Sequence, residues 1–284
     1  MQINKIGTLY VVATPIGNLQ DITLRAIEVL KNVDRIAAED TRHSTPLLNH
    51  FSIKKPTISL HEFNERQRMA EVIELLQGGE SIALISDAGT PLISDPGFPL
   101  VREAKAAGVP VVPVPGACAA IAALSACGLP ADKFVFEGFL SAKPETRRNR
   151  LAALRLETRT IVFYEAPHRL VSALQALAEV FGADRQIVVA RELTKIYESI
   201  LPGTIAELIA YYEAHEKEQR GEVVIIVHGA DEVSESKEIA TEKVLSILLS
   251  ELPLKQAVAL ASKITGERKN ILYDAALQLK GEAE

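Results

Sequence analysis

Short apolar runs alternate with stretches of helical period through the first 115 residues. GTLYVVAT (7–14) predicts a strand, and the apolar spacing of 22–33 predicts a helix. The same alternation then predicts strands at 35–40, 57–63, 81–87 and 109–115, with helices at 45–51, 66–77 and 98–108. Five strands with intervening helices indicate an open, mostly parallel α/β sheet in a first domain of residues 1–117.

A second α/β domain is expected over residues 118–229. It opens with a helix of small residues, and its predicted strands are 133–140, 159–166, 186–194 and 222–229. An acidic stretch without apolar period, 230–240, predicts a solvated linker. The remaining residues, 241–284, predict a helical tail whose last two helices are spaced like a helix-turn-helix.

Composition narrows the class of protein. With 284 residues, 48% of them hydrophobic, the chain can bury a core in each domain. The formal net charge of -6 gives no general attraction for polyanions, so any contact with nucleic acid must use local patches. Cys118 and Cys127 suit neither a disulfide framework nor a zinc site, and no metal is expected. Without a signal peptide or membrane segment, we expect a soluble protein of the cytoplasm.

Ligands of open α/β sheets bind beyond the carboxyl ends of the strands, and four loops there are marked. TPIGNLQD (14–21) is most simply a capped turn. AEDTRH (38–43) brings acid, base and cation together, which fits either a site or an ion pair of Arg42 that closes a turn. VPGACAAIAAL (114–124) offers helix amides to a negative group, although tight helix packing explains it equally well.

The loop SDAGTPLISDPG (86–97) is the most informative of the four. Gly89 and Gly97 allow a close approach of backbone to a ligand, and Asp87 and Asp95 supply acceptors. Loops built only for structure rarely combine these features, so a functional role is favoured.

Three further segments are ambiguous. FYEAPHRL (163–170) and ARELTKIYE (190–198) each follow a strand with mixed charges, which indicates either the far wall of a cleft or a solvated helix start. Residues 143–159 carry six basic residues against two acidic ones, which fits a phosphate-binding surface or an exposed amphipathic helix. The motifs GxGxxG, GxxxxGK[ST], HExxH and GxSxG are missing, which disfavours nicotinamide redox, nucleotide hydrolysis and zinc peptidase chemistry.

Taken in order, TPIGNLQDITLRA, AEDTRHS, SDAGTPLISDPG, PVPGACAA, FYEAPHRL and ARELTKIYE resemble the ribosomal RNA small subunit methyltransferase I family of the tetrapyrrole methylase superfamily. The resemblance covers about 7–229 and the helical tail. It implies two α/β domains with S-adenosylmethionine in the cleft between them, and a homodimer. The implied reaction is 2′-O-methylation of a cytidine ribose in the decoding region of 16S rRNA, within the small ribosomal subunit.

The resemblance also assigns candidate site residues by region. Cofactor contacts are expected at Pro15, Asp87, Ala88, Gly89, Thr90, Pro91, Gly116, Ala117, Cys118, Ala119 and Tyr164. The hypothesis for the base is His43, Asp40 or Glu39, with Glu165 and His168 as second candidates. Phosphates of the RNA are expected to meet Arg42, Lys143, Arg147, Arg148, Arg150 and Lys195.

Two other functions stay open at this point. A methyltransferase of the same fold that acts on a small tetrapyrrole would need neither the basic segment nor the tail. A non-catalytic RNA-binding factor would carry the marked loops as remnants, and it would neither bind S-adenosylmethionine nor transfer methyl.

Overall fold

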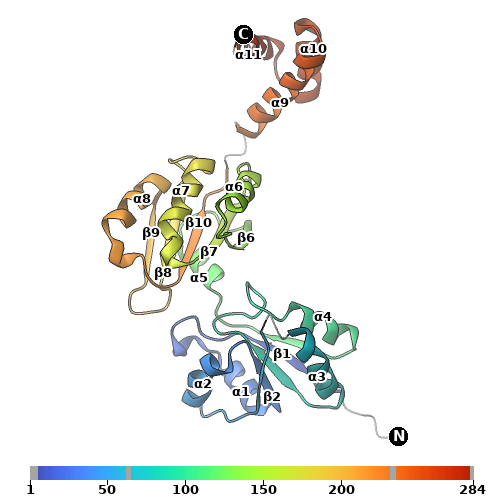
Figure 1. The fold of residues 1–284 in the computed structure, drawn as a ribbon, viewed down its shortest axis with the longest axis vertical. Helices are drawn as coiled ribbons and strands as arrows, with labels where there is room; N and C mark the ends of the chain where they lie inside the picture. The colour runs from blue at the N-terminus through green and yellow to red at the C-terminus, as the bar shows by residue number, and fades with distance from the viewer. Residues whose placement is uncertain (1–5, 62–64, 231–234, 282–284) are drawn as a thin grey trace.

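The computed structural model describes residues 6–61, 65–230 and 235–281. Figure 1 shows three parts in succession along the long axis, two α/β units and a helical tail at the C-terminal end. Each α/β unit is built on its own five-stranded sheet, in the order β3-β2-β4-β1-β5 for the first and β6-β7-β10-β8-β9 for the second.

The first sheet is parallel in every pair of neighbouring strands. Its strands are β1 (Leu9–Val12), β2 (Arg35–Ala38), β3 (Thr57–Ser59), β4 (Ile82–Ile85) and β5 (Val111–Val114). All five strands predicted from the apolar runs are therefore confirmed, with shorter bounds. Buried parallel strands read as continuous apolar segments, which is why they stand out in a sequence.

Helices cover both faces of this sheet. They are α1 (Leu24–Asn32), α2 (Thr41–His50), α3 (Glu65–Gln77) and α4 (Phe98–Ala106), with a 3₁₀ turn η1 (Leu19–Asp21). Helices α1 and α2 pack with Val12 and Ile85, while α3 and α4 pack with Leu9 and Leu84 on the opposite face. Helix α2 begins four residues before its predicted start at residue 45, because Asp40 caps it directly after β2.

The second sheet is mixed. Its strands are β6 (Phe134–Phe139), β7 (Thr160–Glu165), β8 (Gln186–Arg191), β9 (Ser199–Thr204) and β10 (Val223–Val227). Only β6 and β7 pair in parallel, and the other pairs are antiparallel. The apolar pattern does not predict β9, which lies at the edge of the sheet and contains Pro202 and Gly203. Edge strands tolerate such residues where central strands do not.

The faces of this second sheet are covered unequally. On one side lie α6 (Pro144–Ala153), α7 (Leu170–Phe181) and α8 (Ile205–Ala214), whose apolar residues join Phe163 and Ile225 in one core. On the other side α5 (Ala119–Ala126) packs with Val162 and Val224, and Ile16 from the first unit joins that cluster. Two further 3₁₀ turns are η2 (Pro167–Arg169) and η3 (Glu216–Glu218).

The tail consists of α9 (Glu235–Glu251), α10 (Leu254–Thr265) and α11 (Lys269–Gly281), which pack around Leu245, Val258 and Leu272. Gly266, in the left-handed region, ends α10. The expected linker, 230–240, is described only in part, since 231–234 lie outside the described residues. Residues 235–240 form the beginning of helix α9. Across the described parts of the chain, no helix combines the length and apolar character that crossing a membrane requires.

Candidate active site

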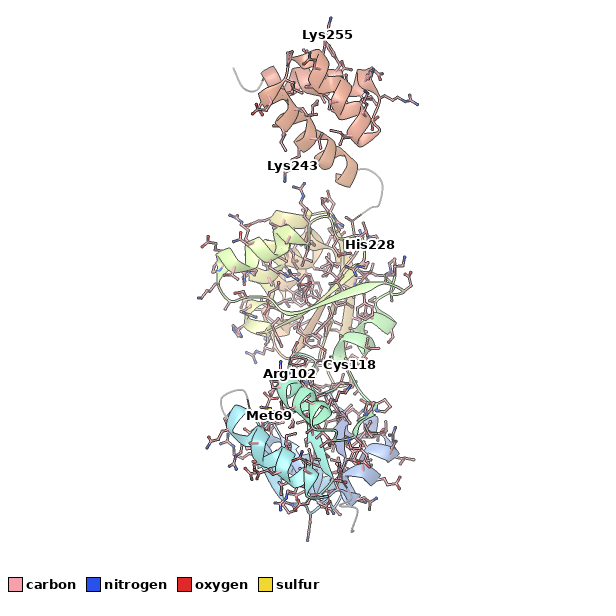
Figure 2. All side chains as sticks on the ribbon, turned by 90° about the vertical axis from the view of Figure 1, so that its right-hand side faces the viewer. Met69, Arg102, Cys118, His228, Lys243 and Lys255 are labelled. Carbon is pink, nitrogen blue, oxygen red and sulfur yellow. The ribbon has the colours of Figure 1, made fainter. Side chains whose placement is uncertain are left out.

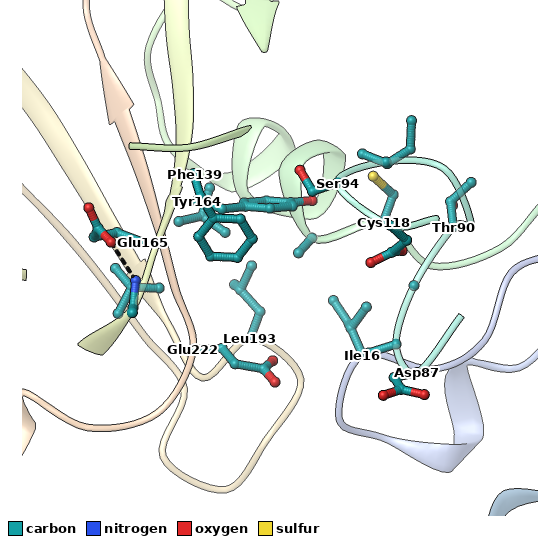
Figure 3. A pocket seen from close by; sticks show the side chains of 18 of the residues that line it. Ile16, Asp87, Thr90, Ser94, Cys118, Phe139, Tyr164, Glu165, Leu193 and Glu222 are labelled. Atoms are coloured by element: carbon teal, nitrogen blue, oxygen red, sulfur yellow. Dashed lines mark hydrogen bonds between the residues drawn. The ribbon is translucent and has the colours of Figure 1, made fainter. Parts of the chain in front are cut away.

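A cavity of about 430 Å³ is lined by residues of both α/β units (Figure 3). The first unit contributes residues that follow β1, β2 and β4. The second contributes the start of α5, the ends of β6 and β7, a residue after β8 and the start of β10. In Figure 3 the rings of Phe139 and Tyr164 lie between Glu165 on one side and Cys118 and Thr90 on the other. The volume is that of a site for one small-molecule ligand.

Three of the marked loops meet at this cavity through specific hydrogen bonds. Backbone of Thr14 and Gly89 pairs in both directions, at 2.8 and 3.1 Å, which joins the first loop to the loop after β4. The Thr90 hydroxyl donates to the carbonyl of Ala117 at 3.0 Å, which adds the segment before α5. Gly89 has a φ of 83° and its Cβ position would lie 3.2 Å from Ile16, so a larger residue would be strained and crowded there.

Carboxylates dominate the wall that the first unit provides. Glu39, Asp87 and Asp95 all line the cavity. Burial, with the nearby charges of Glu39 and Asp87, raises the pKa of Asp95 to about 6. Burial, with the charges of Asp87 and Asp40, also raises the pKa of Glu39. None of the three takes part in an ion pair within the described residues. The charges of His43 and His61 lower the pKa of Glu39, but each has a smaller effect than burial and the neighbouring carboxylates, so the wall stays negative.

The wall provided by the second unit is aromatic and charge-paired. The Tyr164 hydroxyl accepts a hydrogen bond from the Ala120 amide at 3.1 Å, and burial raises the pKa of this phenol. Glu165 is buried, accepts from the amide of Ala166 at 2.7 Å and pairs with Arg169. At the rim, Glu222 lies 3.3 Å from the amine of Lys195, which also pairs with Glu192 at 2.9 Å.

The structure separates the five proposed catalytic residues into two groups. Glu39 and Glu165 line the cavity, whereas Asp40, His43 and His168 are not among its lining residues. Asp40 caps helix α2 by accepting a hydrogen bond from the Arg42 amide at 2.8 Å, and His43 therefore lies in the first turn of that helix. Hydrogen bonds from Arg42 lower the pKa of Asp40 to about 2, and that carboxylate is a weak base. His43 and His168 are exposed.

Most of the proposed cofactor residues come together. The cavity is lined by Asp87, Ala88, Gly89, Thr90, Cys118, Ala119 and Tyr164. The other four lie beside it along the chain without lining it: Pro15, Pro91, Gly116 and Ala117. Pro15 precedes the lining residue Ile16, and Ala117 is held by Thr90.

Several lining residues were missing from the proposed set. They are Ile16, Ile93, Ser94, Asp95, Phe139, Ala166, Pro167, Leu193, Glu222, Val223 and Val224. Asp95 belongs to the loop SDAGTPLISDPG, and its carboxylate, already noted there as a hydrogen-bond acceptor, could have been proposed as a site residue. Glu222 and Leu193 carried no such signal, because their places depend on the pairing of β10 with β8.

The residues proposed to meet RNA differ in how far their charge is already paired. Arg42 pairs with Asp40 at 2.9 Å, Arg148 with Glu179 at 3.0 Å, and Arg150 with Glu137 at 2.6 Å. Lys143 is exposed at the start of α6, and Arg147 is partly buried in its first turns.

Comparison with known proteins places the chain. Residues 8–209 match the family described as Tetrapyrrole (Corrin/Porphyrin) Methylases, and 235–280 match the RsmI C-terminal HTH domain. Over 279 residues the chain is 57% identical to ribosomal RNA small subunit methyltransferase I of Pseudomonas aeruginosa, covering 98% of this chain and 99% of that protein. The chain belongs to this methyltransferase family.

Other relatives and solved structures agree. The small subunit methyltransferase I of Escherichia coli O157:H7 is 51% identical, covering 98% of this chain and 97% of that protein. The methyltransferase CobJ has the same fold, with a TM-score of 0.60, 19% identity, and coverage of 79% of this chain and 95% of that one. A uroporphyrin-III-C-methyltransferase from Thermus thermophilus gives a TM-score of 0.57 at 23% identity, covering 78% and 94%. The expected tetrapyrrole methylase fold is confirmed.

Proposed function

We propose that this chain transfers a methyl group from S-adenosylmethionine to the ribose 2′-hydroxyl of a cytidine in the decoding region of 16S rRNA. The observation that carries the proposal is the 57% identity, over nearly the whole of both chains, to a protein named as a methyltransferase of ribosomal RNA in the small subunit. The cavity adds physical support, since it joins both units and carries an acidic wall.

The cavity residues fit the proposed cofactor. S-adenosylmethionine carries two cationic groups, a sulfonium and an ammonium, and supplies an electrophilic methyl group. Glu39, Asp87 and Asp95 give one wall of the cavity a negative charge that attracts such cations. Ile16 and Leu193 provide apolar surface, and Gly89 lets backbone come close to a ligand.

Within this site we assign Glu39 as the group that accepts the proton of the 2′-hydroxyl. With the cofactor bound, the 2′-oxygen would take the methyl group, S-adenosylhomocysteine would leave, and the Glu39 carboxylate would accept the hydroxyl proton. Burial and neighbouring carboxylates raise the pKa of Glu39, which makes it a stronger base than an ordinary glutamate. Glu165 is the weaker candidate because its pairing with Arg169 neutralises it.

The cationic side chains outside the cavity are assigned to the RNA backbone. Arg42, Lys143, Arg147, Arg148, Arg150 and Lys195 remain the proposed phosphate contacts. For Arg148 and Arg150, a phosphate would replace a carboxylate on the protein surface, so each contact exchanges one ion pair for another. We also propose that the chain acts in the cytoplasm as a homodimer, as the family resemblance implies.

The test is methyl transfer from labelled S-adenosylmethionine to small ribosomal subunits that lack their native modifications. Mass spectrometry of the product should identify a cytidine methylated on its ribose. Methylation at a base, or label on no RNA while the cofactor binds measurably, would contradict the proposal. In the second case the small-tetrapyrrole alternative would regain weight, although the tail and the similarity to rRNA methyltransferases disfavour it.

A further inference from the structure

The tail contains a second hollow, remote in sequence from the cavity. A groove of about 400 Å³ lies between α10 and α11, with Val258 in its lining. Polar side chains of both helices surround it: Lys255, Lys269, Asn270, Tyr273 and Asp274.

The two lysines of this groove differ from the arginines of α6. Lys255 and Lys269 are exposed, and neither belongs to an ion pair among the residues that the structure describes. Arg148 and Arg150, in contrast, are held by glutamates. The lysines therefore offer positive charge to an anion without first giving up a partner.

The remaining groups suit a nucleobase. Tyr273 is 38% exposed, so part of its ring is open to a stacking partner. Asn270 and Asp274 are four residues apart on α11 and share one face of that helix. An amide and a carboxylate side by side present the donors and acceptors that read base edges, the carboxylate accepting from an exocyclic amino group.

We propose that this groove binds an unpaired nucleotide of RNA, with the base against Tyr273, Asn270 and Asp274 and the adjoining phosphates at Lys255 and Lys269. The choice of RNA rests on the proposed function, and the preference for an unpaired strand rests on geometry. The major groove of an A-form duplex is too narrow for a helix and its side chains, so α11 reads bases only where they are unstacked. The tail then adds a second RNA contact to the one at the cavity, and linked contacts strengthen binding together.

The test compares full-length variants in binding a labelled, unstructured RNA oligonucleotide, measured by fluorescence anisotropy. The double variant Lys255→Glu/Lys269→Glu should weaken binding at least tenfold. Loss of two phosphate contacts should also flatten the slope of log affinity against log salt by about 1.4. Tyr273→Ala should weaken binding roughly fivefold or more through lost stacking.

The matched control is Lys243→Glu on α9, an exposed lysine at the opposite end of the tail from Lys255 (Figure 2). The single variant Lys255→Glu makes the same charge change inside the groove and is the direct comparison for it. Lys243→Glu should alter affinity by less than about twofold. Thermal unfolding of all variants checks that the tail is still folded. Equal weakening by the control and groove variants, equal binding of duplex and single strand, or no measurable binding by the unaltered chain would each overturn the proposal.

Activity separates the groove from the proposed function. The groove variants should raise KM for small ribosomal subunits at least fivefold and leave kcat and the cofactor Kd unchanged, because the groove holds RNA away from the reacting atoms. If the unaltered chain methylates subunits and the groove variants match it in KM and oligonucleotide affinity, the groove assignment fails and the function stands. If oligonucleotide binding depends on the groove but no subunit is methylated, the function fails and the groove stands.

Discussion

The two walls of the cavity differ in whether their carboxylates belong to ion pairs. On the first unit's side, Glu39 and Asp95 are half-buried and belong to no ion pair among the described residues, and burial raises the pKa of each. On the second unit's side, Glu165 pairs with Arg169 and Glu222 with Lys195. Carboxylates are thus unpaired in one wall and held in ion pairs in the other.

This difference indicates where proton transfer and cation binding are to be sought. A carboxylate that a guanidinium neutralises is a poor proton acceptor and attracts a cationic ligand weakly. A half-buried carboxylate that belongs to no ion pair is more basic and attracts a cation more strongly. The comparison therefore assigns chemistry to the first unit and support to the second, and four predictions test it.

The largest expected effect is from Glu39→Gln. The variant keeps the shape of the side chain and removes its capacity to take a proton, so the single-turnover rate should fall roughly 10²- to 10⁴-fold. The Kd of the cofactor, measured by calorimetry, should rise far less. The matched change Glu165→Gln in the other wall should lower the rate by less than tenfold. If Glu165→Gln proved the more damaging, the assignment of the two walls would be reversed.

The next effect concerns stability. Arg169→Met leaves the Glu165 carboxylate, whose side chain is 0% exposed, without its cation, and the free energy of unfolding should fall by about 3 kcal/mol. Lys195→Met removes a cation from a partly exposed pair and should cost less than about 1 kcal/mol. Urea unfolding measures both. The double variant Glu165→Gln/Arg169→Met should recover much of the stability that Arg169→Met loses, because no buried charge is left unpaired. If the double variant were as unstable as Arg169→Met, an unpaired charge would not be the cause of the loss.

The third prediction is a pH dependence set by Asp95. Its pKa of about 6 means that the carboxylate is protonated at lower pH, so kcat/KM for the cofactor should fall about tenfold from pH 7 to pH 5. Asp95→Asn should lack this acid limb and bind the cofactor weakly throughout.

The raised pKa of Asp95 also affects stability. The folded state favours the protonated acid, so the stabilising contribution of Asp95 is complete below pH 3.8 and is lost as pH rises through about 6. Asp95→Asn should therefore raise Tm at pH 8, and thermal unfolding at pH 5 should show a smaller increase.

The fold was predictable from the sequence where burial is continuous. Strands β1 and β4, in the middle of the first sheet, are uninterrupted apolar runs. Strand β9, with Pro202 and Gly203, resembles a loop until its pairing with β8 is known. The candidate site was predictable as a set of loops, because glycine and aspartate mark the turn around Gly89 in the chain itself. Which carboxylates line one cavity was not predictable, since the presence of both Glu222 and Glu39 in its lining depends on how the two units meet.

The smallest expected effect is from His43→Ala. The sequence places His43 beside Glu39, and histidine is the usual base near neutral pH, which made it a reasonable hypothesis. In the structure Asp40 begins α2 directly after β2, and the exposed His43 lies in its first turn, outside the cavity lining. Its substitution should change the single-turnover rate by less than about twofold. A loss of tenfold or more, with cofactor affinity unchanged, would return the base to α2 and undo the contrast between the two walls.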